Sequence, residues 1–412
     1  MSSMNGQRRL GSGTFLLLVI LLGAFGPIST DMFLPALPDM VDEFDTTAAV
    51  MNMTLYGFMF SMAVSILLLG PVTDKYGRKA PLVICLAEYV VTTLLCAFVH
   101  DVGILIVLRV LQAIGAGAAM TLSTAFVKDC YSGAIRLKIL NIVAIVGVLG
   151  PLLAPIAGAA LISLWGWRAT FIAPAVIALV CLVLALMLDE TLPDGERVDG
   201  GLSDMLQGMK QLCCTPSFLV FTVMICLFNL PFMAYLSVSS YIYEGMFGVE
   251  PVAYSLILAT TLIVGTVVMM LINRLTGNIV KRRIIGLYLV LGGFSGIATL
   301  LVGDTAWYVF FVCFSVCVAV NITIRPWGMG ILMASHDGDS GAVSSLINFM
   351  FFLIGCIGMV LSTLPWKDYV FGLAVLICIS SVLYALLWTV FKTGRMELKG
   401  LDGTSSEVSE RR

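Results

Sequence analysis

Apolar stretches long enough to cross a bilayer recur along the whole chain, separated by short polar segments. A transmembrane helix needs about 20 predominantly apolar residues, and twelve stretches meet that requirement. Glycine and proline inside them do not argue against helices, because neighbouring helices can satisfy the freed backbone groups. The pattern predicts an all-α membrane protein with spans near residues 13–36, 48–71, 80–98, 102–126, 138–163, 168–188, 217–240, 251–272, 284–303, 305–333, 342–364 and 368–391.

The composition supports this class. Of the 412 residues, 59% are hydrophobic and 12% are charged, whereas a soluble domain carries about 25% charged residues. The net charge of −2 argues against nucleic acid as a partner, since a nucleic-acid binder shows a basic face. The eleven cysteines have no repeated spacing, which gives neither a disulfide framework nor a metal site, and we interpret them as packing residues.

The positions of the basic residues predict an orientation. If both termini are cytoplasmic, the inside segments hold 19 of the 23 Lys and Arg residues, and the outside loops hold only Arg168 and Lys367. Such a bias is the positive-inside rule. The loop at 335–341 is an exception, because it is predicted to lie inside and contains no Lys or Arg. We therefore expect both termini on the cytoplasmic side.

The longest polar connection, from about Asp189 to Pro216, divides the chain into two halves of six spans each. Part of it, Leu202–Leu212, is a candidate for an amphipathic helix on the membrane surface. Six plus six spans are typical of secondary transporters, although a channel or a respiratory subunit can also have twelve. The expected domains are an N-terminal six-helix bundle at 1–190, a cytoplasmic linker at 191–216, a C-terminal six-helix bundle at 217–393 and a polar cytoplasmic tail at 394–412.

The connection between the second and third predicted spans carries a charged motif, Gly70-Pro71-Val72-Thr73-Asp74-Lys75-Tyr76-Gly77-Arg78-Lys79. Gly70 would let helices approach closely, and Gly77 would permit a tight turn. Asp74 and Arg78 offer opposite charges at the cytoplasmic face. The segment resembles the signature loop of the major facilitator superfamily, G-x-x-x-D-R/K-x-G-R-K; the alternative is a basic inside loop with a chance match.

Two further segments are similar to motifs of that superfamily. In the fourth span, Arg109 and Gln112 match its R-x-x-Q-G pattern, except that Ala113 replaces the glycine. In the fifth span, a run rich in glycine and proline resembles the motif associated with proton antiporters, where small residues four apart let helices pack closely. That run contains Gly147, Gly150, Pro151, Pro155 and Gly158.

Within the superfamily, the segment from Ser29 to Pro38 resembles the first helix of the Bcr/CflA group of drug:proton antiporters, to which bicyclomycin and chloramphenicol exporters belong. The W-R-x-x-F element at Trp167–Phe171 is also typical of that group, although aromatic residues can simply anchor a span at the outer interface. The resemblance implies the major facilitator fold in a bacterial inner membrane. It covers the N-terminal half, and the C-terminal half has no motif of comparable strength.

Asp31, Glu88, Arg109 and Arg325 fall inside predicted spans, where a charge costs at least about 2.5–3.5 kcal/mol on insertion scales. We predict that Asp31 carries the proton, because a carboxylate in a poorly hydrated cavity can bind and release a proton near neutral pH. The alternative is a helix-end aspartate of an acidic outer loop, since three further aspartates follow within 14 residues.

The other three charges have competing interpretations. Arg109 is expected to be a counter-charge that couples to Asp31 through an ion pair, or a structural bridge between spans one and four; the two roles are compatible. Glu88 is a second proton site, an ion-pair partner or a neutral, hydrogen-bonded carboxyl group. Arg325 binds substrate anions or pairs across the two halves when the inside gate closes.

The resemblance also implies a lock at the cytoplasmic face. Asp129 is expected to pair with Arg78, while Asp74 faces the second half, and such contacts would hold an outward-facing state. Some relatives carry a second carboxylate about two turns before the Asp31 position. Here that stretch reads Gly23-Ala24-Phe25, which leaves the proton stoichiometry and the export of cationic drugs open.

Aromatic and polar residues within the spans are candidates for a substrate pocket, although such residues also face lipid or other helices. The candidates are Tyr56, Gln112, Phe228, Asn229, Phe232, Tyr235, Arg325, Asn348 and Phe349.

These features together predict a monomeric secondary active transporter that exports small hydrophobic drugs in exchange for protons. The alternative is a proton-coupled or facilitative transporter of a natural metabolite, such as an amino acid or a sugar. We expect no cofactor, because no G-x-x-x-x-G-K-[ST] loop is present and the proton gradient supplies the energy. An enzyme is disfavoured, because His100 and His336 are predicted to lie on opposite sides of the membrane and cannot form one site.

Overall fold

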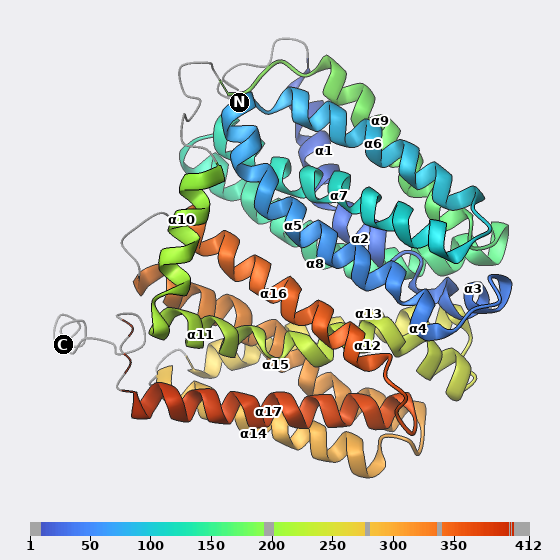
Figure 1. The fold of residues 1–412 in the computed structure, drawn as a ribbon, viewed down its shortest axis with the longest axis vertical. Coiled ribbons are helices and arrows are strands. Elements are labelled where there is room, and N and C mark those ends of the chain that lie inside the picture. Colours follow the sequence, from blue (N-terminus) through green and yellow to red (C-terminus); the bar gives the residue numbers. More distant parts are fainter. Residues whose placement is uncertain are drawn as a thin grey trace. The chain divides into compact units, whose positions relative to one another are not determined.

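The structure is a computed structural model that describes residues 10–192, 202–276, 281–335 and 340–394, together with Met396 and Leu398. Every regular element in these ranges is a helix (Figure 1). Eleven helices are long and apolar enough to cross a membrane, or twelve when the bent pair Ser12–Gly23 and Phe25–Glu43 counts as one span. The predicted all-α membrane class is confirmed. Parts of the predicted linker (193–201) and tail (395, 397 and 399–412) lie outside the described residues.

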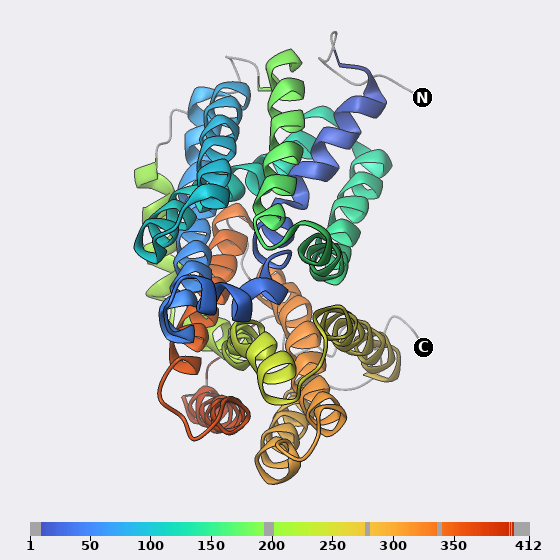
Figure 2. The same ribbon diagram turned by 90° about the vertical axis from the view of Figure 1, so that its right-hand side faces the viewer.

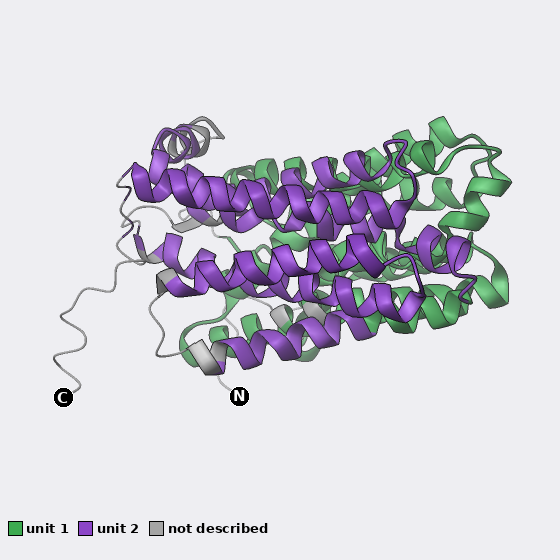
Figure 3. Ribbon diagram, turned by 90° about the horizontal axis from the view of Figure 1, so that it is seen from below, with its two compact units in different colours: residues 1–205, 250–259 green, residues 206–249, 260–412 purple. Residues whose placement is uncertain are grey.

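The chain forms two compact units, coloured separately in Figure 3. Unit 1 comprises Met1–Met205 and Glu250–Ala259. Its central helix is α7 (Val102–Cys130), which packs against α1, α2, α5 and α6, and Figures 1 and 2 show α5, α6 and α7 side by side. The other elements are α1 (Ser12–Gly23), α2 (Phe25–Thr30), η1 (Leu34–Ala36), α3 (Leu37–Glu43), α4 (Ala48–Met51), α5 (Met53–Tyr76), α6 (Lys79–Phe98), α8 (Gly133–Trp165) and α9 (Ala169–Met187).

Unit 2 comprises Leu206–Val249 and Thr260–Arg412. Within it, α12 (Asn229–Ser240) packs along α16 (Ser340–Ser362), and α14 (Lys281–Val302) packs between α15 (Trp307–Ser335) and α17 (Tyr369–Thr393). The helix expected in the linker is present as α10 (Leu202–Cys213), which crosses the border between the units. The remaining elements are α11 (Pro216–Cys226), the π-helix η3 (Tyr241–Met246) and α13 (Pro251–Thr276), whose first residues belong to unit 1.

Two spans that the hydrophobic pattern predicts as continuous have a lapse in their helical hydrogen bonding, and a proline explains each lapse. Pro27 has no N–H to donate to the carbonyl of Gly23, and α1 ends at Gly23. The chain bends there by 50°. Pro231 likewise cannot donate to the carbonyl of Leu227, and the gap between α11 and α12 falls at Leu227 and Phe228. The first span is therefore bent near its middle, whereas Pro216–Met246 remains one span with a local interruption.

Most of the charged motif after the second span is helical, whereas the sequence analysis placed it in a loop. Residues 70–76 form the last turns of α5, and only Gly77 and Arg78 connect α5 to α6. Gly77 has φ 88°, so the expected tight turn requires glycine. No atom lies within 4 Å of the place where a Cβ of Gly70 would stand, so the expected close approach is not made to a helix of unit 1.

Candidate functional site

Asp31 lies at the point where the first span loses its helical conformation. It caps the C-terminal end of α2, and its backbone N–H donates to the carbonyl of Pro27 over 2.8 Å. The side chain is 7% exposed, and its Oδ1 accepts a hydrogen bond of 2.8 Å from the Thr30 hydroxyl. The carboxyl group is therefore nearly enclosed, with one hydroxyl donor beside it.

Two glycines of the motif in α8 allow that helix to pack directly against the segment that carries Asp31. A Cβ on Gly158 would overlap the carbonyl oxygen of Met32, and a Cβ on Gly150 would lie 2.7 Å from Cγ of Pro27. Gly147 has no atom within 4 Å of its Cβ position. Pro151 and Pro155 also lie inside α8, and the Ser255 hydroxyl donates to the carbonyl of Pro155 over 3.0 Å.

Arg109 of α7 is completely buried in an aromatic cage formed by three phenylalanines. Its Cζ lies 4.4 Å from the ring centroid of Phe33, 4.3 Å from that of Phe58 and 5.7 Å from that of Phe171. Each ring offers a cation–π attraction, which is strongest where water is excluded. The cage stabilises a charge that would otherwise be costly at this depth.

The predicted ion pair between Asp31 and Arg109 is not formed. Nη1 of Arg109 instead donates to the backbone carbonyl of Ser29 over 2.9 Å and to Oε1 of Gln112 over 2.7 Å. No carboxylate among the described residues lies within ion-pair distance of Arg109, and its Nε and Nη2 are buried without a hydrogen-bond partner. The connection to Asp31 thus runs through the α2 backbone, two residues before the carboxyl group.

A buried hydrogen-bond network extends from this point into α6. The hydroxyls of Ser29 and Tyr89 lie 2.6 Å apart, and Nε2 of Gln112 donates to the Thr93 hydroxyl over 2.7 Å. The network joins α2, α6 and α7 around Arg109. Because every member is held by a partner on another helix, a displacement of α2 would be felt by Arg109.

Glu88 lies outside this network. It shares a face of α6 with the exposed residues Ile84 and Val91, and its side chain is partly exposed. Both carboxyl oxygens are nevertheless buried and have no hydrogen-bond partner among the described residues. Gly115 of α7 leaves room for them, since a Cβ there would stand 3.0 Å from Oε2. No ion pair to Glu88 is present within the described ranges, and its roles as a second proton site or as a neutral buried carboxyl stay predictions.

At the other end of unit 1, Arg78 connects three carboxylates. Its Nε donates to Asp129 over 2.9 Å, as expected, and its Nη1 donates to Asp74 over 2.6 Å. Asp74 therefore pairs within unit 1. Burial disfavours the charge on Arg78, but Asp129 and Asp74 outweigh this effect and raise the pKa of the guanidinium above its ordinary value.

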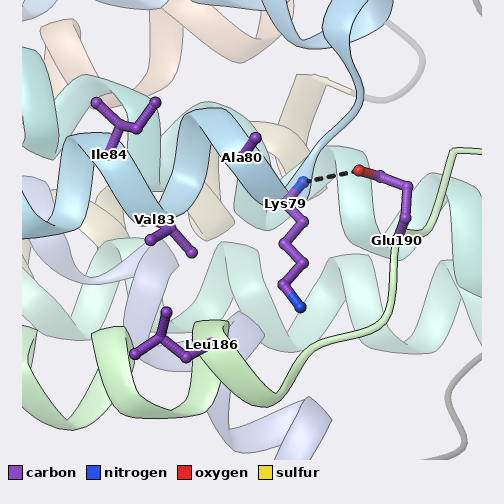
Figure 4. A pocket seen from close by; sticks show the side chains of 6 residues that line it. All are labelled: Lys79, Ala80, Val83, Ile84, Leu186 and Glu190. Atoms are coloured by element: carbon purple, nitrogen blue, oxygen red, sulfur yellow. Dashed lines mark hydrogen bonds between the residues drawn. The ribbon is translucent and has the colours of Figure 1, made fainter.

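The third carboxylate, Glu190, follows α9 and caps the N-terminus of α6. Its Oε1 accepts from the backbone N–H of Arg78 over 2.8 Å, and its Oε2 accepts from that of Lys79 over 3.2 Å. A carboxylate at this position satisfies N–H groups that have no helical partner. Figure 4 shows Glu190 reaching Lys79 at the edge of a shallow pocket of about 370 Å³ between α6 and the end of α9.

The W-R-x-x-F element joins the opposite end of the unit to the arginine cage. Trp167 Nε1 donates to Glu43, and Nη2 of Arg168 donates to the same carboxylate over 2.7 Å. The Arg168 guanidinium also stacks over the Trp167 ring at 4.4 Å. One turn later, Phe171 contacts Arg109. The element is therefore both an anchor and a wall of the cage.

In unit 2, Arg325 of α15 is held by two residues of α16. Its Nη2 donates to Oδ1 of Asn348 over 2.6 Å, and its Cζ lies 3.9 Å from the ring centroid of Phe351. Nδ2 of Asn229 donates to the backbone carbonyl of Phe351 over 2.7 Å, which fixes that turn of α16.

The predicted pocket residues divide into two groups. Tyr56, Phe232, Arg325, Asn348 and Phe349 are partly exposed, whereas Gln112, Phe228, Asn229 and Tyr235 are buried. Phe228 packs against Tyr384 at 5.5 Å, and Tyr235 stacks on Phe314 at 4.3 Å. Both rings are core side chains of unit 2 in this structure, Phe228 in the gap before α12 and Tyr235 on the buried face of α12. The sequence pattern does not distinguish such buried positions from a pocket.

Sequence reasoning missed several participants. Phe58 has no motif around it, and only the tertiary packing of α5 on α7 brings it to Arg109. Thr93 and Glu190 were likewise not predicted. Phe33 and Phe171 lie inside motifs that the sequence analysis identified, but those motifs did not predict their contact with Arg109. All eleven cysteines are free thiols, and eight are buried, in agreement with a packing role.

The comparisons with known proteins agree with these motifs. The family model described as Major Facilitator Superfamily matches residues 19–359. The chain is 28% identical to a chloramphenicol resistance protein of Pseudomonas aeruginosa, over 68% of this chain and 66% of that protein. It is 22% identical to a bicyclomycin resistance protein homolog of Haemophilus influenzae, over 83% of this chain and 87% of that one.

The fold is also found among solved structures. A bacterial homolog of the human lysosomal transporter Spinster, in an inward-facing and occupied conformation, superposes with a TM-score of 0.74 at 15% identity, over 94% of this chain and 98% of that chain. At this identity the likeness concerns the fold alone. The chain spans only 55–66% of the length of three of the relatives that it matches.

Proposed function

Because the chain belongs to the major facilitator superfamily of membrane transporters, we propose that it exports small hydrophobic drugs in exchange for protons by alternating access. Relatives named for chloramphenicol and bicyclomycin resistance support the drug-export part of the proposal. The antiporter-like glycines of α8, which pack against the Asp31 segment, support the exchange part. The proposed location is a bacterial inner membrane, with both termini cytoplasmic, as the basic residues indicate.

The observation that carries the proposal is the enclosure of the Asp31 carboxyl group at the broken end of α2. An ionised carboxylate in such a place is costly, whereas the protonated form is not. A conformation that opens this site to water therefore favours the charged form, and a conformation that encloses it favours the neutral form. Proton binding and conformation are then linked, because a ligand shifts an equilibrium by its differential affinity for the two states.

Arg109 is proposed to transmit the state of Asp31 to α7. Its guanidinium is fixed by the Ser29 carbonyl and the aromatic cage, and three of its five N–H groups have no partner among the described residues. A carboxylate displaced toward Arg109 would satisfy those N–H groups. We propose that the deprotonated and the protonated forms of Asp31 select two arrangements of α2 against α7.

The domains and the cytoplasmic contacts complete the proposal. The halves 1–190 and 217–393, with the linker 191–216 and the tail 394–412, would move as two bundles, as other superfamily members do. The Arg78 cluster with Asp74, Asp129 and Glu190 lies within unit 1 and would shape the surface that the second half meets in the outward-facing state. Isolated surface ion pairs contribute little, but the two ion pairs of Arg78 with Asp74 and Asp129 are partly buried and share one guanidinium.

The test compares wild type with Asp31→Asn in everted membrane vesicles, with rhodamine 123 and chloramphenicol as cargo. Imposing a pH gradient should drive uptake by wild type, and Asp31→Asn should abolish the gradient-driven part while the protein still reaches the membrane. Gradient-driven uptake that survives Asp31→Asn unchanged would refute the proton role. Gradient-independent exchange of amino acids or sugars, with no drug uptake, would instead favour a metabolite transporter.

A further inference from the structure

The charge of Arg325 is not balanced in the part of the chain that the structure describes. No carboxylate there lies within ion-pair distance of its guanidinium. Among the described residues, its hydrogen-bond partner is a neutral amide, the Oδ1 of Asn348. A cation inside a membrane span without a counter-charge is costly, and such residues mark ligand or ion pathways by default.

Arg325 lies inside its span. At 1.5 Å per residue, it is about 27 Å from the Trp307 end of α15 and about 15 Å from the Ser335 end. Its guanidinium is held between helices by Asn348 and Phe351, so a counter-charge would come from inside the protein or from a bound molecule.

The Arg325 guanidinium is held in place, but several of its N–H donors make no hydrogen bond within the described ranges. The ring of Phe351 covers one of its faces at 3.9 Å, and Asn348 fixes one Nη2 proton at 2.6 Å. A guanidinium has five N–H donors, so Nε, Nη1 and the second Nη2 proton remain without a hydrogen bond within the described ranges. Both Arg325 and Asn348 keep part of their surface exposed, so these donors are reachable.

The surroundings suit the rest of an amphipathic molecule. Phe232, Phe349 and Phe352 are partly exposed aromatic side chains on the same two helices, α12 and α16, that position Arg325 and its partners. Pockets for small molecules combine such apolar walls with a few oriented polar groups.

We propose that Arg325, Asn348 and Phe351 form a recognition site for an anionic group, so that preferred substrates are hydrophobic molecules carrying a carboxylate. This inference rests on the proposed export function and names its substrate class. Arginine suits the role because its planar fork binds a carboxylate with two parallel hydrogen bonds.

Two xanthene dyes of similar size and opposite charge test the proposal by fluorescence anisotropy with the purified protein. Fluorescein carries a carboxylate and is anionic at neutral pH, whereas rhodamine 123 is an ester and a cation. Wild type should bind fluorescein more tightly than rhodamine 123. Arg325→Met should weaken fluorescein binding about tenfold or more, since a charge-assisted pair contributes at least that much, and should change rhodamine 123 binding less than about twofold.

A second variant keeps Arg325 but supplies an internal carboxylate that competes with the ligand for its guanidinium. Asn348→Asp places a carboxylate where the amide oxygen stands 2.6 Å from Nη2, so it should abolish fluorescein binding while retaining the fold. Arg274→Met, at an exposed position of α13, is the matched control and should bind both dyes as wild type does.

The outcomes separate this inference from the proposed function. Equal losses for both dyes in Arg325→Met, or unchanged fluorescein binding in both Arg325→Met and Asn348→Asp, would overturn the anion site. Because binding is measured without a proton gradient, a failure of proton coupling leaves the result intact. Charge-selective binding together with gradient-independent transport would retain the site and discard the antiport.

Discussion

Gly158 and Gly147 belong to the same motif, but the structure assigns them different consequences. Gly158→Ala puts a methyl group against the backbone of Met32, the residue after Asp31, whereas Gly147→Ala puts it into open space. The two variants are therefore a matched pair on one helix, with the same chemical change. Their comparison tests whether close packing of α8 on the Asp31 segment matters for transport.

The size of the effect follows from the distances. The added methyl of Gly158→Ala would overlap the carbonyl oxygen of Met32, whereas ordinary contact begins at 3.4 Å, so the segment must withdraw by more than about 1 Å. A backbone atom cannot yield by changing rotamer, and such overpacking costs about 1–3 kcal/mol. If that energy falls on one transport state, the equilibrium shifts by about 5- to 150-fold. In Gly147→Ala, alanine replaces glycine in a helix without a clash, which is favourable by up to about 1 kcal/mol.

The assay is the initial rate of pH-driven rhodamine 123 uptake in everted vesicles, normalised to the amount of inserted protein. Gly158→Ala should lose at least about four fifths of the rate, the lower end of the 5- to 150-fold range, and Gly147→Ala should retain it. Thermal unfolding of the purified variants shows whether each one folds. Equal impairment by the two substitutions, or full activity of a folded Gly158→Ala, would refute the packing argument.

Two further substitutions probe the other clusters. Arg109→Ala should insert normally but lose transport, because the cage of three rings then surrounds no charge; wild-type rates in vesicles would contradict the proposed link to Asp31. Asp129→Asn should weaken the Arg78 cluster while leaving Asp74 in place, and cysteine-crosslinking or accessibility labelling should show a shifted balance of inward- and outward-open states; an unchanged balance would exclude a locking role.

The sequence predicted the spans because bilayer length and apolar composition are local properties of the chain. The bend in the first span and the local interruption at Leu227 and Phe228 were within reach of the same reasoning, because Pro27 and Pro231 cannot donate hydrogen bonds to the carbonyls of Gly23 and Leu227. Asp129 as the partner of Arg78 was also predicted, through the resemblance to the signature motif. The expected close approach at Gly70 stays a prediction, since no helix of unit 1 contacts it.

The arrangement around Arg109 was beyond the sequence. The charge of an arginine in a span needs a stabilising partner, and the sequence analysis expected that partner to be the carboxylate of Asp31. The structure compensates it with the Ser29 carbonyl, Gln112 and three aromatic rings instead. Which helix faces meet is decided by tertiary packing, and the chain gives no local signal that Phe58 should face α7 rather than lipid.

The most direct test of the central claim is a measurement of proton movement itself. The purified protein is reconstituted into liposomes that contain a pH-sensitive dye, and rhodamine 123 is added on one side without any imposed gradient. The proposed exchange predicts that wild type moves protons in the direction opposite to rhodamine 123 and that Asp31→Asn moves no protons. The proposal would be contradicted if rhodamine 123 moved at the same rate in wild type and Asp31→Asn and neither protein moved protons in the opposite direction.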